Sequence, residues 1–166
     1  MASITLKGNA ISTIGELPTI GTQAIDFNLI KNNLSTVSLA DFKGKKLILN
    51  IFPSLDTGTC AASVRNFNTE AAGLNNTEVL CVSRDLPFAQ ARFCGAEGIN
   101  KVTTASDFVS GKFGKDYQLE IQNGPLANLH SRCIIVLDEN HKVVYTQQVS
   151  EIVDEPDYTS AIAAAK

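Results

Sequence analysis

The sequence has 166 residues, of which 44% are hydrophobic and 19% are charged, and its formal net charge is -3. These values are ordinary for a soluble globular protein, and a chain of this length buries roughly two thirds of its unfolded surface. With this net charge and no long run of like charges, nothing in the sequence indicates nucleic acid or an anionic membrane as a partner. No signal peptide and no apolar run near the ~20 residues that span a bilayer are visible. We therefore expect one domain over residues 1–166 and a cytoplasmic location.

Short strands and one helical turn are predicted for the first third of the chain. Gly8-Asn9 is a two-residue turn signal and favours an opening hairpin. The nearly continuous apolar run Lys45–Phe52 is typical of a strand buried on both faces. In chain order, the predicted elements are hairpin strands 4–7 and 10–13, strand 27–30, a helical turn at 39–43 capped by Ser38, and strand 45–52.

A helix is predicted directly after this apolar strand. Pro53 cannot donate to a β-ladder, so the strand ends there. The helix-capping residues that follow are Asp56, Thr57 and Thr59. Cys60 then begins a series at helical spacing that continues with Val64, Phe67, Ala71 and Leu74. Cys60 is therefore expected in the first turn of a helix that starts at the end of a central strand.

This position has a chemical consequence for the Cys60 thiol. Free amide groups and the positive end of the helix dipole favour a thiolate, which is the reactive form of cysteine. The alternative is that Cys60 packs as a small buried hydrophobe. The strand end, Pro53 and the hydroxyl of Thr57 favour reactivity.

The second part of the chain alternates strands and helices. Pro87 suits the first position of a helix that reaches Cys94, and Gly95 stands where a helix usually stops. The order of elements predicts an α/β fold with a mixed sheet covered by helices on both faces. In chain order, the predicted elements are strand 78–83, helix 87–94, a weak strand 101–104, helix 107–117, a loop with Gly124-Pro125, strands 133–137 and 142–149 joined by the turn 138–141, and a final helix opened by Pro156.

Two motifs resemble those of the peroxiredoxins. Pro53, Thr57 and Cys60 match the signature Pro-x-x-x-Thr-x-x-Cys of this family, and the segment Asp85–Gly98 is similar to the thiol peroxidase subfamily. The similarity runs from the opening hairpin to Glu155-Pro156-Asp157-Tyr158. The resemblance implies a thioredoxin-like fold with an added amino-terminal hairpin, and a cysteine that reduces hydrogen peroxide and organic hydroperoxides.

The resemblance also implies a role for five residues. Cys60 supplies the attacking thiolate, Thr57 bridges the sulfur and the peroxide oxygen, and Pro53 shields the sulfur. Arg132 is expected to hydrogen-bond the thiolate and the peroxide with its planar guanidinium. Cys94 is expected to resolve the sulfenic acid as a disulfide within one chain, which thioredoxin then reduces. Because a disulfide joins sulfurs about 2 Å apart, both helix ends are expected to rearrange first.

Family resemblance further implies a homodimer with contacts near the active-site loop and Gly124-Pro125-Leu126. Cys81 and Cys133 fall in predicted strand cores and are interpreted as packing residues. His130 and His141 stand alone, and no close Cys/His spacing indicates zinc. No metal or other cofactor is therefore expected.

Two other functions compete with the peroxidase. A thioredoxin-type thiol–disulfide oxidoreductase normally carries Cys-x-x-Cys at its helix start, whereas Ala61, Ala62 and Ser63 follow Cys60 here. A non-enzymatic thioredoxin-fold module for binding or chaperoning is expected to have lost part of the set Pro53, Thr57, Cys60 and Arg132. All four are present.

Overall fold

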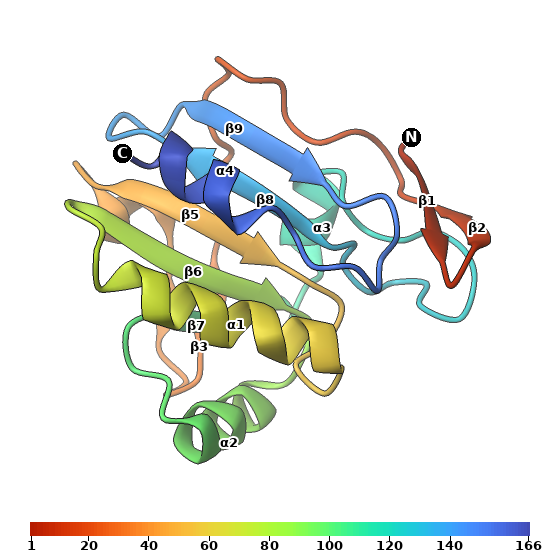
Figure 1. Ribbon diagram of the computed structural model, residues 1–166, viewed down its shortest axis with the longest axis horizontal. Helices are drawn as coiled ribbons and strands as arrows, with labels where there is room; N and C mark the ends of the chain where they lie inside the picture. Colours follow the sequence, from red (N-terminus) through yellow and green to blue (C-terminus); the bar gives the residue numbers. More distant parts are fainter.

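A seven-stranded mixed β-sheet forms the centre of the structure, a computed structural model that describes residues 1–166 (Figure 1). The three central strands, β5 to β7, are parallel, and the pairings on either side of them are antiparallel. In sheet order, the strands are β4 (Thr36–Val37), β3 (Leu29–Lys31), β7 (Thr103–Ser106), β6 (Thr77–Ser83), β5 (Lys46–Ile51), β8 (Cys133–Leu137) and β9 (Val143–Gln148). The predicted mixed sheet is thereby confirmed.

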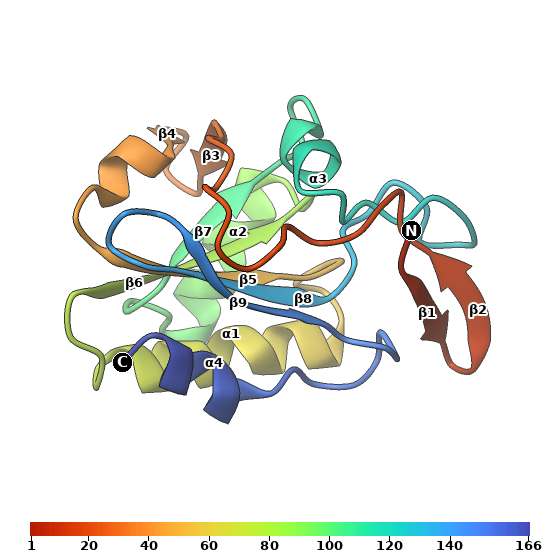
Figure 2. The same ribbon diagram turned by 90° about the horizontal axis from the view of Figure 1, so that it is seen from above.

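Helices cover both faces of this sheet (Figure 2). Helices α1 (Gly58–Ala71) and α4 (Tyr158–Ala164) lie on one face, and η1 (Leu39–Phe42) and α3 (Lys112–Asp116) lie on the other. Helix α2 (Pro87–Glu97) packs against β7. Because successive strand residues point to opposite faces, β5 contributes Leu47, Leu49 and Ile51 to one core and Ile48 to the core under α1.

The amino-terminal hairpin stands apart from the main sheet (Figure 1). It consists of β1 (Ser3–Leu6) and β2 (Asn9–Ser12), in which Leu6 pairs with Asn9. The predicted turn at Gly8-Asn9 was wrong by one residue. Lys7 and Gly8 form the turn with φ values of 50° and 80°, the left-handed conformations that a tight two-residue hairpin requires.

Helix α2 is longer than predicted. The expected stop at Gly95 was wrong, because the helix continues to Glu97 and ends at Gly98. Gly98 has a φ of 66°, and its N–H donates to the carbonyl of Cys94. This left-handed ending favours a glycine after the last helical residue, and the sequence offers two glycines, Gly95 and Gly98, for that position. Cys94 therefore lies inside the helix and not at its end.

Other predicted boundaries were shifted as well, among them that of strand 27–30, which the structure has as β3 at Leu29–Lys31. Strand β7 lies at 103–106 instead of 101–104, because its pairing with β6 joins Cys81 to Thr104. Helix α3 covers only Lys112–Asp116 of the expected 107–117. The residue before it, Gly111, has a φ of 65°, which is not a helical conformation, so the helix cannot start earlier. The last helix begins at Tyr158 and is capped by Asp157, so Pro156 precedes it. The short strand β4 was not predicted.

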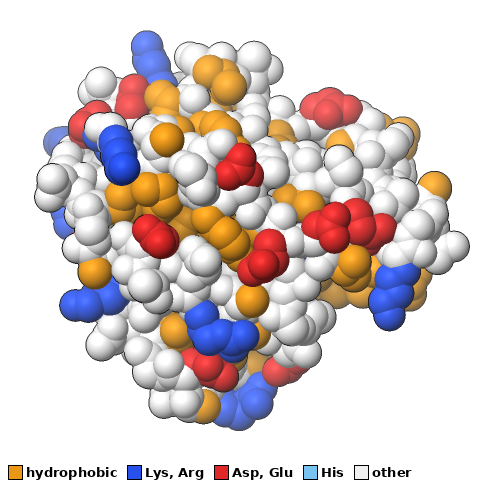
Figure 3. All heavy atoms as spheres, in the orientation of Figure 1, with side chains coloured by type: hydrophobic (Ala, Val, Ile, Leu, Met, Phe, Trp, Pro, Cys, Tyr) orange, Lys and Arg blue, Asp and Glu red, His pale blue; other side chains and the backbone are white.

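Charged side chains of both signs are scattered over the face that carries α1 and α4, and no continuous basic area is visible there (Figure 3). None of the helices has the length and apolar composition needed to cross a membrane.

Candidate active site around Cys60

Cys60 lies where the sequence predicts, in the first turn of α1 beyond the end of β5. Its side chain is completely buried, in the core cluster that fills the space between α1 and the sheet. Pro53 is also buried, and it ends the strand as expected. The helix begins at Gly58, so Cys60 belongs to its first turn, where backbone N–H groups have no partner within the helix.

Arg132 is in direct contact with this cysteine. The arginine is only 2% exposed, and its Nη2 donates to Cys60 Sγ at 3.3 Å. Its Nε donates to the carbonyl oxygen of Ile152 at 2.8 Å, which fixes the plane of the guanidinium. Nη1 is buried and has no hydrogen-bond partner. A buried donor without a partner is costly, so this nitrogen is available to a ligand oxygen beside the sulfur.

A pocket of about 450 Å³ opens next to this pair. Pro53, Thr57 and Arg132 all line it, so the structure brings together these residues and the Cys60 sulfur. Much of the exposed wall of the pocket is apolar, and an apolar wall strengthens electrostatic interactions inside the pocket once a ligand displaces water from it. The other lining residues are Leu6, Lys7, Ser54, Gly58, Thr59, Leu126, Leu129, Ile152 and Val153.

The Thr57 hydroxyl makes a different hydrogen bond from the one predicted. Thr57 is the N-cap residue of α1, but its side chain does not cap the helix. Instead, Oγ1 donates to the carbonyl oxygen of Ser54 at 3.1 Å. The expected bridge to the Cys60 sulfur is therefore not formed in this state. Because Thr57 lines the pocket, rotation of its side chain is enough to redirect the hydroxyl.

The remaining cysteines differ from Cys60 in their surroundings. Cys81 and Cys133 are completely buried in β6 and β8, and burial raises the pKa of each thiol to about 12. Cys94 is half-buried on α2, and burial raises the pKa of its thiol as well. Its sulfur lies 3.8 Å from Thr104 Oγ1 on β7. All four cysteines are free thiols, so the structure does not join Cys94 to Cys60.

Sequence reasoning missed the residue that holds the loop before α1. The carboxylate of Asp85 accepts hydrogen bonds from Ser54 Oγ, from the Leu55 N–H and from Ser83 Oγ. Asp85 was noted only as the first residue of the second motif. An acidic residue two positions beyond a buried strand, next to a loop rich in donors, is the signal that could have found it.

Glu151 attaches the amino-terminal hairpin to the rim of the pocket. Its carboxylate accepts hydrogen bonds from the N–H groups of Lys7 and Gly8 and from the hydroxyl of Thr5. These bonds, with that of Gly8 the largest cause, lower the pKa of Glu151 from 4.5 to about 2. Leu6 and Lys7 are thereby held against the pocket.

Glu151→Gln is expected to lower stability in a pH-dependent way. The native pKa is below that of the unfolded chain, so the carboxylate stabilises the fold fully above pH 4.5 and loses this effect as the pH falls toward 2. The difference in urea midpoint between wild type and variant should therefore be largest at pH 7 and shrink by pH 3. Asp154→Asn, at an exposed carboxylate nearby, is the matched control and should show no such trend. A pH-independent difference for Glu151→Gln would contradict this account.

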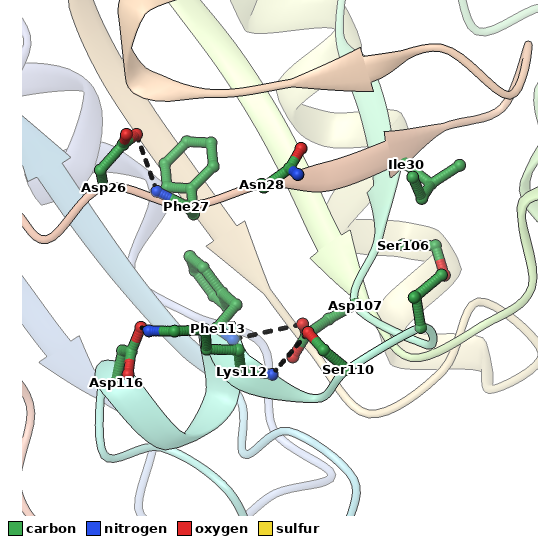
Figure 4. A pocket seen from close by; sticks show the side chains of 11 residues that line it. Asp26, Phe27, Asn28, Ile30, Ser106, Asp107, Ser110, Lys112, Phe113 and Asp116 are labelled. Carbon is green, nitrogen blue, oxygen red and sulfur yellow. Dashed lines mark hydrogen bonds and ion pairs between the residues drawn. The ribbon is translucent and has the colours of Figure 1, made fainter.

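A second pocket, of about 380 Å³, lies between the start of β3 and α3 (Figure 4). Asp107 lines it and also pairs with buried His130, at 2.9 Å between the carboxylate and Nε2. The same carboxylate accepts the N–H groups of Phe113 and Gly114, so the His130 pair holds α3 in place. None of the residues predicted for the active site lies in this pocket.

Comparison with known proteins places the chain among redox proteins. The Redoxin family model matches residues 19–162. The chain is 55% identical over 164 residues to a thiol peroxidase of Corynebacterium glutamicum, with 99% of each chain covered.

Solved structures of peroxiredoxin-like proteins have the same fold as this chain. A peroxiredoxin-like protein from Aquifex aeolicus matches with a TM-score of 0.93 at 33% identity, over 98% of this chain and 95% of that chain. A thiol peroxidase from Chromobacterium violaceum matches with a TM-score of 0.85 at 20% identity, over 95% of this chain and 91% of that chain. The predicted thioredoxin-like fold with its added amino-terminal hairpin is confirmed.

Proposed function

Because the chain belongs to the Redoxin family and is a thiol-dependent peroxidase, we propose that Cys60 is the sulfur that reduces the hydroperoxide. The observation that supports this most strongly is the contact between the Cys60 sulfur and the buried guanidinium of Arg132, at 3.3 Å. No other cysteine in the chain has an arginine donor on its sulfur. The similarity to a thiol peroxidase favours the peroxidase over the two alternatives, a thioredoxin-type oxidoreductase and a non-enzymatic module.

The reaction follows from the groups around the sulfur. The thiolate attacks one oxygen of the peroxide, the S–O bond forms as the O–O bond breaks, and the second oxygen leaves as hydroxide or alkoxide and takes up a proton. Arg132 Nη1, which has no partner in the protein, donates to the oxygens as charge develops on them. Thr57 exchanges its bond to Ser54 for one to the peroxide, and Pro53 shields the sulfur from water.

Cys94 then resolves the sulfenic acid. Its thiol sulfur attacks the Cys60 sulfur, the S–S bond forms, and the hydroxyl leaves as water. The two sulfurs are not joined in the described state, because Cys60 is completely buried under α1 and half-buried Cys94 lies on α2 against Thr104 of β7. The first turn of α1 and the last turn of α2, which includes Cys94, must therefore open before the two sulfurs meet. Addition of a Cβ at Gly95 would meet no atom within 4 Å, so this part of α2 is loosely covered.

A dithiol protein must return the disulfide to two thiols, and we take thioredoxin to be this reductant. We also propose a homodimer whose contacts include Gly124-Pro125-Leu126. Its support is that Leu126 lines the pocket beside Arg132, so a partner seated there would close the site. A single domain over residues 1–166 and a cytoplasmic location complete the proposal.

Cys94→Ser is expected to separate the two steps. Cys60 still reacts with peroxide in this variant, so one burst of about one peroxide per chain should precede a loss of turnover with thioredoxin. The sulfenic acid then persists, and mass spectrometry should find sulfinic acid on Cys60 at lower peroxide doses than in wild type. Cys81→Ser, at another buried cysteine, is the control and should keep steady turnover. Wild-type turnover and wild-type resistance to over-oxidation in Cys94→Ser would reject resolution by Cys94.

A further inference from the structure

A connected set of hydrogen bonds links the loop that carries Cys60 to the helix that carries Cys94. At its centre is Asp85, in the connection between β6 and α2. One carboxylate oxygen accepts from Ser54 Oγ at 2.7 Å, and the other accepts from the Leu55 N–H at 2.8 Å and from Ser83 Oγ at 2.6 Å. Leu55 is 3% exposed, and its side chain packs in the same core cluster as Cys60.

The same set of bonds continues into α2. Ser83 Oγ also accepts a hydrogen bond from Gln90 Nε2 at 3.3 Å, and Gln90 is completely buried. Gln90 Nε2 donates in addition to the carbonyl oxygen of Ala105 on β7 at 3.0 Å. Gln90 and Cys94 are four residues apart, so they lie on the same face of the helix. Both contact β7, Gln90 at Ala105 and Cys94 at Thr104.

The carboxylate of Asp85 does not cap helix α2. The N-cap residue of α2 is Leu86, and no side chain caps this helix. All three donors to the carboxylate are neutral, and two of them belong to the loop between Pro53 and Thr57 that lines the pocket. A serine hydroxyl can find another acceptor by rotation, but the Leu55 N–H is fixed in direction. Asp85 therefore holds the backbone of this loop in one position.

Peroxide reduction and disulfide formation make opposite demands on this set of bonds. Reduction needs the loop fixed, because Pro53, Thr57 and Arg132 must surround the sulfur in one geometry. Disulfide formation needs Cys60 and Cys94 to leave their packed positions. We propose that Asp85 is a positioning residue that favours the packed state, in which peroxide is reduced, over the open state, in which the disulfide forms. This inference rests on the proposed roles of Cys60 and Cys94.

Asp85→Ala is expected to change the two steps in opposite directions. Oxidation of Cys60 by peroxide should slow by about 10- to 100-fold, because a small misplacement of reacting groups is enough for losses of this size. Conversion of the sulfenic acid to the Cys60–Cys94 disulfide should become faster than in wild type. The variant should also form less sulfinic acid at high peroxide, because faster resolution competes with over-oxidation. Asp85→Asn keeps one carbonyl oxygen that can accept the Leu55 N–H, so both rates should change in the same directions but by smaller factors.

The measurement is rapid mixing with peroxide, followed by thiol blocking and mass spectrometry of the Cys60 and Cys94 peptides at each time. The matched control is Asp56→Ala in the same loop, whose carboxylate pairs only with exposed Arg92 on α2 at 3.0 Å. An exposed pair of this kind contributes little, so both rates should stay within about threefold of wild type. Urea unfolding of each variant establishes that the folded state is the one measured.

Opposite changes in the two rates support the inference. Unchanged rates in both Asp85 variants would overturn it and would leave the proposed function intact. A slowing of both steps would also overturn it, since this is what a general structural defect produces. Failure of the proposed function would be visible separately, as the absence of Cys60 oxidation or of the Cys60–Cys94 disulfide in the wild-type protein.

Discussion

Cys60→Ser is expected to abolish peroxide reduction and to leave the fold intact. The substitution removes the nucleophilic sulfur, and a serine hydroxyl beside Arg132 cannot accept an oxygen from peroxide to form the sulfenic acid. The change in volume is small, so the core under α1 should remain packed. Consumption of hydroperoxide with thioredoxin as the reductant is the measurement, with the urea midpoint as the check on folding.

Cys133→Ala is a suitable control for this result. Cys133 is completely buried and directly follows Arg132 in the sequence, but it carries a thiol whose pKa burial raises to about 12. The variant should retain peroxidase activity although its core loses a sulfur atom. Activity of Cys60→Ser close to that of wild type would contradict the assignment of Cys60.

Arg132→Lys is expected to slow the oxidation of Cys60 by about 100-fold, the usual effect of losing one donor to a developing negative charge. Arg132 uses three nitrogens in different directions, toward the Cys60 sulfur, the Ile152 carbonyl and the pocket. An ammonium has a single nitrogen and cannot reproduce this planar arrangement. The second-order rate of Cys60 oxidation is the quantity to measure.

The matched control for Arg132→Lys is Arg84→Lys. Arg84 also donates to backbone carbonyl oxygens, those of Asn128 and Phe108, but it does not line the pocket. Its substitution should leave the oxidation rate within about threefold of wild type, as for most changes away from a reacting centre. If Arg132→Lys slows the oxidation of Cys60 by less than about threefold, the guanidinium does not act on the reacting atoms.

Local patterns in the sequence were sufficient to predict most of the fold. Buried strands such as β5 and β8 are nearly continuous apolar runs, and residue type alone predicted β8 at its observed bounds and β5 within one residue at each end. The limits of α2 and α3 depended on which glycine adopts a left-handed conformation, and Gly95, Gly98 and Gly111 cannot be distinguished by residue type. The position of β7 was decided by its pairing with β6, a contact between distant residues.

Only those residues of the candidate site that belong to a short sequence motif could be predicted from local sequence. Pro53, Thr57 and Cys60 lie within eight positions of one another, so a short signature contains them. Arg132 is 72 residues from Cys60, and family resemblance rather than spacing identified it. Asp85 joins the loop to α2 through contacts across 30 and 31 residues. The sequence shows an acidic residue two positions beyond a buried strand, but it does not show which donors that residue binds. Those contacts depend on how the strands align in the sheet.

The central claim is that Cys60 reacts with peroxide and that Cys94 of the same chain resolves it. Its most direct test is peptide mapping of the wild-type protein after one equivalent of hydroperoxide, with free thiols blocked and without reductant. The account predicts a Cys60–Cys94 peptide as the main product, from protein that runs as a monomer on a non-reducing denaturing gel. A covalent dimer, or a peptide that joins Cys60 to Cys81 or Cys133, would contradict it.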